Sequence, residues 1–397
     1  MKHTFKILFL AAMASMASLA TAGVQDGRRE LRILNPSPLS GLTADTGKKQ
    51  AESIEKSLHY LSKDSDIKVV YKSVDDQFKP QVAIKVIPEE IQKFKPAAIV
   101  GVFGTPNVQL LVKEKIFENS KIPMIGSRSG ATDGVFSEYT HHIRASFSDE
   151  IGGYLRNSLG NKKVCVFYVA SSFGEEGVKA VQKSIAERAA QGDKIAFDKA
   201  SHAPNSIAVE EGIQNLMNKN CDLIVMQTTT APAKAALSEI KRIYDQKYGE
   251  KTKLELGDAR PSLSVLMISS IDPATLDYKK AVSESDRIWL SFTSVVPNTA
   301  DEFSNTASFL TDYRNFLKQE KLTDSTTVKE GFLISKITIQ AAKNVKGKIT
   351  GEKLQEQLKT LKVRIGSGMV LDMSKKRASN RVFYQFYDKT TQKLVDM

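Results

Sequence analysis

Short apolar runs alternate with longer amphipathic stretches along most of the chain. The apolar runs end in turns rich in Gly, Ser, Thr and Pro, and the stretches after them carry apolar residues at helical spacing. Unbroken apolar runs are typical of parallel strands that are covered on both faces. Strands that alternate with helices in this way predict an α/β protein in which right-handed crossovers join parallel strands.

The first series of strands and helices ends in two turns of small residues. Strands are predicted at 31–34, 67–71, 99–103 and 122–125, and helices at 44–61, 82–92 and 108–118. Pro88 is expected to kink or split the second helix. The turns, 104–107 and 126–132, follow the last two strands. If these strands are parallel neighbours, both turns lie at the sheet edge where open α/β sheets bind ligands.

A second series begins at Lys163, after residues 144–150, which have the character of a crossing between two lobes. It contains predicted strands at 163–169, 194–198, 222–227, 264–269 and 287–292, and predicted helices at 175–190, 206–219 and 233–248. Helices at 300–318, 328–345 and 351–361 and strands at 368–371 and 381–387 complete the chain. Because 397 residues exceed what one core usually serves, the two series predict two similarly built lobes.

The first 22 residues have the pattern of a secretory signal peptide. Lys2 and Lys6 precede an apolar run at 7–19, and Ala20-Thr21-Ala22 forms a small-residue cleavage site. No later stretch approaches about 20 uninterrupted apolar residues. No cysteine lies beside the cleavage site, which disfavours a lipid anchor. We therefore expect a cleaved, freely diffusing exported protein.

Composition and charge fit an ordinary globular protein. The chain is 41% hydrophobic and 26% charged, with a formal net charge of +12. The lysines are scattered at helix-surface spacing and form no dense basic run. This pattern favours a solvated surface over a nucleic-acid or membrane partner, so we predict no nucleic acid partner.

Two pairs of residues leave alternatives open. Cys165 and Cys221 lie near the beginnings of two predicted strands. An exported protein permits a disulfide, but apolar strand positions more often hold buried free thiols, which we favour. Asp75 and Asp76 are either metal ligands or caps of backbone amides. Without further ligands at suitable spacing, capping is favoured, and we predict neither a metal nor a cofactor.

Motifs for catalysis are scarce. Arg128 occupies the nucleophile position of a Gly-x-Ser-x-Gly elbow, and neither a phosphate-binding Gly-rich loop nor a His-Glu-x-x-His helix is present. His141 and His142 face opposite ways if they lie on a strand, which argues against a shared metal or base role. These features favour a binding protein, with an exported hydrolase as a less favoured alternative.

Several motifs together resemble one family. They are Gly104-Thr105-Pro106, the run from Ile122 to Ala131, Arg144-Ala145-Ser146 with Glu150, and Val295-Val296-Pro297. In this order and spacing they resemble the leucine/isoleucine/valine-binding protein family. These type I periplasmic binding proteins deliver ligands to ABC transporters. The similarity runs from about Leu31 to the C-terminus.

The resemblance implies a fold and a function. The fold is the two-lobed type I periplasmic binding fold, in which each lobe is a parallel sheet flanked by helices and three segments form the hinge. The implied lobes are 23–146 with 298–366 and 147–297 with 367–397. The implied function is that of the periplasmic solute-binding component of an ABC transporter, with a permease in the inner membrane as partner. A periplasmic sensing subunit of a receptor system would use the same fold and remains an alternative.

The resemblance also implies a ligand site for an amino acid or a related amide or carboxylate. Its residues are Ser40, Thr105, Ser129, Gly130 and Ala131 in the first lobe and Tyr168, Phe173, Gln227, Thr228 and Ser270 in the second. Thr105, Ser129 and the amides near Gly130 and Ala131 suit a ligand carboxylate. For any one of these hydroxyls, turn capping is an equal alternative.

Two positions depart from the family pattern. Asp272 is the acid available near the end of the 264–269 strand, where amino-acid binders place a partner for the ligand ammonium. Arg128 replaces a residue that is usually apolar. An arginine in the cleft would contact an anionic group of the ligand, whereas an arginine that points to solvent or pairs with Asp133 is at least as expected. The sequence leaves the ligand open.

Overall fold

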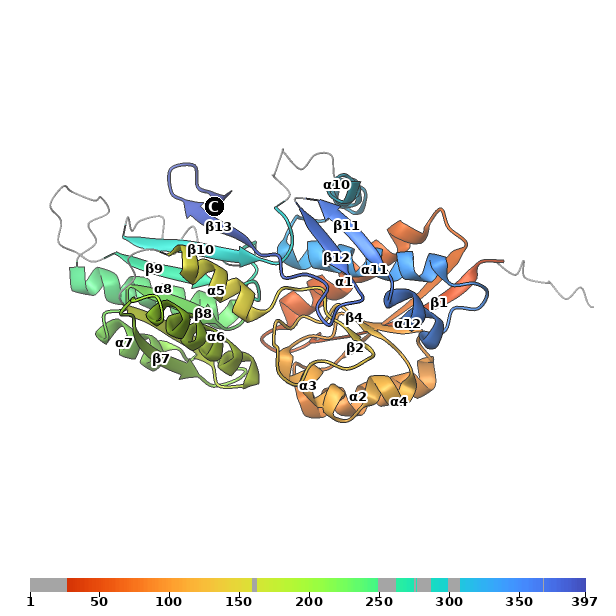
Figure 1. The fold of residues 1–397 in the computed structure, drawn as a ribbon, viewed down its shortest axis with the longest axis horizontal. Coiled ribbons are helices and arrows are strands. Elements are labelled where there is room, and N and C mark those ends of the chain that lie inside the picture. The colour runs from red at the N-terminus through yellow and green to blue at the C-terminus, as the bar shows by residue number, and fades with distance from the viewer. Residues whose placement is uncertain are drawn as a thin grey trace, which may run out of the picture.

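The computed structural model describes residues 27–158, 163–248, 262–274, 276, 287–298, 308–366 and 368–397. Two helix-covered sheets lie side by side in it, and we call each sheet with its helices a lobe (Figure 1). The predicted signal peptide and the first part of the predicted helix at 300–318 lie outside the described residues. Within the described ranges, no helix combines the length and the apolar character needed to cross a membrane.

Lobe 1 is built on a five-stranded, fully parallel sheet in the order β2-β1-β3-β4-β5. The strands are β1 (Arg29–Ser37), β2 (Ile67–Asp75), β3 (Ala98–Val100), β4 (Met124–Ile125) and β5 (Thr140–His141). The helices between them are α1 (Ala44–Ser62), α2 (Pro80–Phe94), α3 (Thr105–Lys113) and α4 (Ile116–Ser120). The chain leaves β1 for β2 on one side and returns to β3 on the other. The carboxyl ends of β1 and β3 therefore form a switch point, where open sheets of this kind bind ligands.

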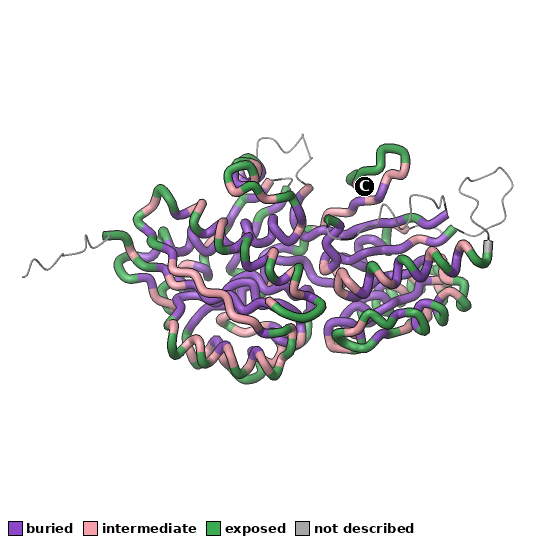
Figure 2. The backbone as a smooth tube through the Cα atoms, turned by 180° about the vertical axis from the view of Figure 1, so that it is seen from behind, coloured by how far each residue is buried: buried purple, intermediate pink, exposed green. Residues whose placement is uncertain are grey.

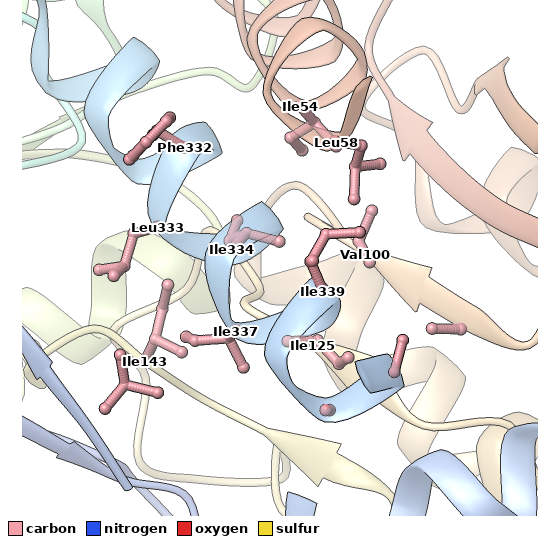
Figure 3. Packing of buried hydrophobic residues seen from close by; sticks show 14 of the residues in the cluster. Ile54, Leu58, Val100, Ile125, Ile143, Phe332, Leu333, Ile334, Ile337 and Ile339 are labelled. Atoms are coloured by element: carbon pink, nitrogen blue, oxygen red, sulfur yellow. The ribbon is translucent and has the colours of Figure 1, made fainter. Parts of the chain in front are cut away.

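The C-terminal part of the chain returns to complete lobe 1. It contributes α10 (Ser308–Glu320), α11 (Thr326–Asn344), α12 (Gly351–Leu358) and the antiparallel pair β11 (Lys362–Gly366) and β12 (Met369–Asp372). Figure 3 shows side chains of α11 meeting Ile54 and Leu58 of α1 and Val100 and Ile125 of the sheet. Leu371 of β12 belongs to the same apolar cluster. Residues 369–372 thus lie with lobe 1, although the predicted division assigns everything from 367 onward to lobe 2.

Lobe 2 is built on a seven-stranded sheet in the order β14-β13-β10-β9-β8-β6-β7. Five strands are parallel, namely β6 (Lys163–Val169), β7 (Ala196–His202), β8 (Leu223–Gln227), β9 (Leu263–Met267) and β10 (Ile288–Ser294). Antiparallel β13 (Phe383–Asp388) and β14 (Lys393–Asp396) extend the edge. The helices are α5 (Phe147–Asn157), α6 (Ser172–Ala189), α7 (Glu210–Asn218) and α8 (Thr230–Tyr248).

The α/β prediction with parallel sheets and flanking helices is confirmed. All residues of β8 and six of the seven in β6 are buried, as expected for unbroken apolar strands covered on both faces. Figure 2 shows buried backbone running through the interior of both lobes. One local prediction is wrong. The helix expected at 108–118 is two helices, because Lys115 takes a left-handed conformation between α3 and α4. Pro88 lies inside α2, which runs unbroken from Pro80 to Phe94, so this proline does not split the helix.

The prediction that Cys165 and Cys221 are free thiols is also wrong, because the two residues form a disulfide. Cys165 lies on β6 and Cys221 comes just before β8, which is the parallel neighbour of β6. This pairing brings the two Cα atoms to 6.0 Å, within the range that a disulfide requires. The strand order, which the sequence pattern does not reveal, decides the outcome.

Three segments cross between the lobes. The first runs from Arg144 into α5, which begins with a capping box made by Ser146 and Asp149. The second leaves β10 through Val296, which packs in the lobe 1 core. The third leads from β12 to β13, and on it the Arg377 guanidinium donates to the carbonyl oxygens of Arg144, at 2.7 Å, and Ala131. The third crossing is thereby tied to the first.

Candidate functional site

A pocket of about 190 Å³ lies between the two lobes, at the carboxyl ends of their strands. Lobe 1 lines it with Leu42, Thr43, Asp45, Thr46, Phe78, Phe103, Gly104 and Arg128, lobe 2 with Phe147, Phe173, Thr229, Thr230, Ala231, Lys234 and Ser270, and the first crossing with Arg144. This is the sheet edge at which the two small-residue turns predicted a ligand site. Both lobes and the hinge therefore contribute side chains to one pocket.

The loop after β2 places Phe78 in the pocket through its two acidic residues. The Asp76 carboxylate accepts a hydrogen bond from the Phe78 amide at 2.9 Å and another from Asn107 Nδ2 at 3.1 Å. Burial raises the pKa of Asp76 to about 7. Asp75 accepts from the Leu39 amide at 2.8 Å and the Gln77 amide at 2.9 Å. Both acids thus bind backbone amides, as the capping interpretation predicted.

No group of three or more His, Cys, Asp or Glu side chains suited to a metal ion occurs among the described residues. The two acids discussed for a metal each use their oxygens to order the loop between β2 and α2. The described lining of the pocket offers a ligand its arginines, its hydroxyls and its aromatic rings.

Two pairs of phenylalanines face the pocket, one from each lobe. In lobe 1, the rings of Phe78 and Phe103 meet nearly at right angles, with centroids 5.6 Å apart. In lobe 2, the rings of Phe147 and Phe173 are 5.4 Å apart. Gly104 lies beneath the first pair with φ of +90°, and a Cβ atom there would come within 2.3 Å of the Phe78 ring. A glycine is required for the Phe78 ring to lie where it does.

Arg128 is buried at the pocket with its hydrogen-bond donors unused. Its backbone extends the pairing of β3 and β4, because its amide donates to the Val102 carbonyl at 2.8 Å. Its side chain is 3% exposed, and no described atom accepts a hydrogen bond from any of its three guanidinium nitrogens. Glu330 of α11 is 3.7 Å away, beyond hydrogen-bond distance. Burial lowers the pKa of Arg128, and the negative charge of Glu330 opposes this effect.

The ion pair suggested for Arg128 with Asp133 is not formed. Asp133 pairs instead with Lys179 of α6, with a distance of 3.0 Å between its carboxylate and the lysine Nζ. Arg128 lies over the ring of Phe103, with its guanidinium carbon 5.5 Å from the ring centroid. Of the orientations considered for this arginine, the structure has the one in the cleft.

A second buried arginine links the lobes beneath the pocket. Arg144 donates to Ser269 Oγ and lies 3.7 Å from the other oxygen of Glu330. Ser269 in turn donates to Glu150 from its amide, at 2.9 Å, and from its hydroxyl, at 2.7 Å. Thr293 of β10 donates to the same carboxylate. Glu330 in lobe 1 is thereby connected through Arg144 to the ends of β9 and β10 in lobe 2.

Three of the predicted site residues line the pocket, namely Arg128, Phe173 and Ser270. The predicted hydroxyls of lobe 1 lie elsewhere. Thr105 and Ser129 are buried and hydrogen bonded to each other at 2.9 Å. Ser40 donates to Asp75 at 2.6 Å. Each of these three hydroxyls is therefore hydrogen bonded within lobe 1.

The remaining predicted residues also lie outside the pocket lining. Gly130 and Ala131 are buried, and a Cβ atom at Gly130 would meet the Phe147 ring at 2.8 Å. In lobe 2, Gln227 donates to the Phe173 carbonyl at 2.9 Å, and Thr228 is hydrogen bonded to His202 at 2.7 Å. Tyr168 is buried on β6 and does not line the pocket. Asp272, the candidate ammonium partner, also lies outside the pocket lining.

Several pocket residues were missed by the sequence analysis. Thr229 and Thr230 directly follow the predicted Thr228, so the correct turn was found with its register displaced. Phe147 lies within the segment identified as a crossing. No sequence signal marks Phe78, whose place depends on the loop held by Asp76. The same is true of Glu330, which lies outside the lining and which α11 brings near Arg128 from a distant part of the chain.

Comparison with known proteins identifies solved structures that share this fold. Among solved structures, a substrate-binding periplasmic protein from Ralstonia solanacearum matches with a TM-score of 0.79 and 20% identity, covering 92% of this chain and 100% of that one. A possible leucine/isoleucine/valine-binding protein from Rhodopirellula baltica has a TM-score of 0.79 and 19% identity, covering 94% and 98%. A branched-chain amino acid ABC transporter protein from Thermus thermophilus with bound valine has a TM-score of 0.73 and 14% identity, covering 94% and 96%.

At these identities the structural matches show a shared fold. No curated protein sequence matches the chain significantly. The sequence does match the family model described as periplasmic binding protein over residues 30–248, which is more than half of its 397 residues. The chain therefore belongs to the periplasmic binding protein family.

Proposed function

We propose that this protein is the periplasmic solute-binding component of an ABC transporter. It captures a small molecule, an amino acid or a related amide or carboxylate, and presents it to a permease in the inner membrane. The observation that carries the proposal is the pocket between the lobes, because both lobes and the hinge contribute residues to its lining. The fold shared with substrate-binding proteins of known structure supports it.

The proposed mechanism is closure of the hinge over the ligand. A ligand first meets the lobe 1 wall formed by Phe78, Phe103 and Arg128, and lobe 2 then closes with Phe173 and Thr230. Ligand shifts the protein toward the closed form only through the extra contacts that it makes there. The chain from Glu330 through Arg144 to Ser269 crosses the hinge beneath the pocket, so it couples ligand contact to the relative position of the lobes.

Two hydroxyl–histidine pairs bear on the hydrolase alternative. Ser127 is hydrogen bonded to His142 at 2.8 Å, and Thr228 to His202 at 2.7 Å. All four residues are buried and none lines the pocket. Burial also lowers the pKa of His142 to about 3, far below that of an effective base at neutral pH. We therefore propose binding without turnover.

The test is ligand-dependent compaction of the exported chain. Mature protein is unfolded with its disulfide intact, freed of ligand, refolded, and screened against amino acids, amides and carboxylates. A ligand specific for the native state stabilises it by about 2.7 kcal/mol at a hundredfold excess over its dissociation constant. We expect a hit to raise the melting temperature and to reduce the radius of gyration in X-ray scattering. Stabilisation without any compaction would contradict the closure mechanism.

The fate of the ligand distinguishes the transporter role from the sensing alternative. Cells that lack the protein are supplied with the labelled hit from the screen. Loss of uptake supports the transporter role. Normal uptake together with a lost cellular response would support a periplasmic sensing subunit instead.

A further inference from the structure

Arg128 provides a receptor for one anionic group. It is 94% buried at the pocket, and none of its guanidinium nitrogens donates a hydrogen bond to any described atom. Leaving buried donors without acceptors costs free energy, on the order of 1–3 kcal/mol for each group. The planar guanidinium fork matches the two oxygens of a carboxylate. The three nitrogens have almost no accessible surface, so the fork has to turn toward the pocket, and a carboxylate bound there then supplies the missing acceptors.

The opposite walls of the pocket provide a slot for a ring. Phe78 and Phe103 face it from lobe 1, and Phe147 and Phe173 face it from lobe 2. Aromatic rings favour edge-to-face or offset contact with other rings, which adds to the gain from apolar burial. Because each lobe supplies one pair, a flat ring between them touches more aromatic surface when the lobes close.

The pocket lacks a partner for an ammonium group beside Arg128. Among the described lining residues the one carboxylate is Asp45, which is exposed at the start of α1. Glu330 lies outside the lining, between the guanidinium groups of Arg128 and Arg144. In an α-amino acid the two charged groups share one carbon, so the ammonium partner has to lie next to the carboxylate receptor. The hydroxyls that would suit an amino acid, Thr105 and Ser129, bind each other instead.

The volume of the pocket fits a ligand with one ring. An apolar cavity of about 150 Å³ in another protein holds benzene. The pocket here measures about 190 Å³, which leaves room for a short chain and a carboxylate beside the ring.

We propose that the ligand is a small aromatic carboxylate that carries no ammonium group next to its carboxylate. Arg128 binds the carboxylate, and the two phenylalanine pairs hold the ring between the lobes. This inference rests on the proposed binding function and narrows its ligand class.

The test compares three molecules of the same shape by calorimetric titration of the ligand-free, disulfide-intact protein. They are 3-phenylpropanoate, L-phenylalanine, which adds the ammonium, and 3-phenylpropanamide, which removes the negative charge. We expect 3-phenylpropanoate to bind at least tenfold more tightly than either of the others. Equal or tighter binding of phenylalanine, leucine or valine would overturn the inference.

Variants assign the effect to Arg128. Arg128→Met should weaken 3-phenylpropanoate binding at least a hundredfold, and Arg128→Lys, which keeps the charge and loses the fork, about tenfold. Arg156→Met is the matched control, because Arg156 is exposed on α5 and its loss changes the net charge equally. Melting curves without ligand establish that each variant is folded. Unchanged binding by a folded Arg128→Met protein would overturn the inference.

X-ray scattering, together with the titrations, tests the proposed solute-binding function and the proposed ligand class separately. If leucine or valine compacts the protein and binds more tightly than 3-phenylpropanoate, the solute-binding function stands and the aromatic carboxylate is rejected. If 3-phenylpropanoate binds with the expected preference but leaves the scattering unchanged, the ligand class stands and closure is rejected.

Discussion

At the scale of single residues, burial shifts the pKa values of two side chains in opposite directions. Burial raises the pKa of Asp76 to about 7 and lowers the pKa of His142 to about 3, because both groups lose water that would solvate their charged forms. Each side chain is nevertheless hydrogen bonded, Asp76 to the Phe78 amide and His142 to Ser127 and the Val135 carbonyl. Their effects on stability therefore have opposite slopes in overlapping pH ranges.

The Asp76→Asn variant removes the contribution of Asp76 to the pH dependence of stability. Between about pH 4 and pH 7 the folded protein holds a proton on Asp76 that the unfolded chain releases, so this residue makes stability fall as pH rises. Asparagine stays neutral and removes that loss. We expect the stability of the variant relative to wild type to rise between pH 4.5 and pH 8, by about 1.4 kcal/mol for each pKa unit removed. Urea unfolding at both pH values measures it, and parallel curves would contradict the raised pKa.

At the scale of elements, the junction of β3 and α3 holds one wall of the pocket. Gly104 has φ of +90° and lies under the Phe78 ring, where a Cβ atom would come within 2.3 Å of it. Gly134 also has a positive φ, +68°, but the nearest atom to a Cβ there is 3.5 Å away. The two glycines therefore separate backbone strain from steric conflict with the ring.

Gly104→Ala and Gly134→Ala form a matched pair. Both should lose about 1–2 kcal/mol of stability, because alanine disfavours a positive φ. Gly104→Ala should lose about 1–3 kcal/mol more and should also weaken ligand binding, because Phe78 has to move. Urea unfolding and ligand titration of both variants provide the measurement. Equal losses in the two variants would show that Phe78 is not held by this contact.

The disulfide is the covalent link between two elements of lobe 2. It joins Cys165 on β6 to Cys221 before β8 and closes a loop with a sequence separation of 56. In the chain-entropy account, such a link stabilises the folded state by about 4 kcal/mol. We expect dithiothreitol to lower the urea midpoint of wild type to that of a Cys165→Ala/Cys221→Ala variant, which itself should not respond. An unchanged wild-type midpoint after verified reduction would refute this estimate.

Local patterns predicted the elements more successfully than the contacts. The strands β6 and β8 were found because each is an unbroken apolar run, and that property needs no knowledge of neighbours. The disulfide depends on β6 and β8 being adjacent, and the register of Thr229 and Thr230 depends on how their turn faces lobe 1. Arg128 was identified as a candidate. The carboxylate 3.7 Å from its guanidinium, that of Glu330, comes from α11, and no local pattern connects the two.

At the scale of the whole molecule, the third crossing closes the hinge. The Arg377 guanidinium donates to the carbonyl oxygens of Arg144 and Ala131, and the Ala378 amide donates to the His142 carbonyl at 2.7 Å. Burial lowers the pKa of Arg377 to about 10, which still leaves it charged at neutral pH. Hydrogen bonds from a charged donor are worth about 1.5–3 kcal/mol each.

Arg377→Met should loosen the ligand-free molecule. Without the guanidinium, the third crossing is no longer tied to the first, and the lobes sample more open arrangements. We expect a larger radius of gyration without ligand and a lower free energy of unfolding, by a few kcal/mol. Arg381→Met serves as the control, because Arg381 is exposed and lies over the Phe383 ring. Identical scattering from both variants would argue against the hinge role of Arg377.

The return of the C-terminal helices to lobe 1 also governs when the protein folds. The Ser335 hydroxyl on α11 donates to the Ile54 carbonyl of α1, 281 residues earlier, and α11 fills the core of lobe 1. Contacts so distant in sequence make folding slow. Lobe 2 likewise receives β13 and β14 last. A chain emerging from the ribosome thus completes lobe 1 only after α11 has been made and lobe 2 only after β13 and β14 have been made.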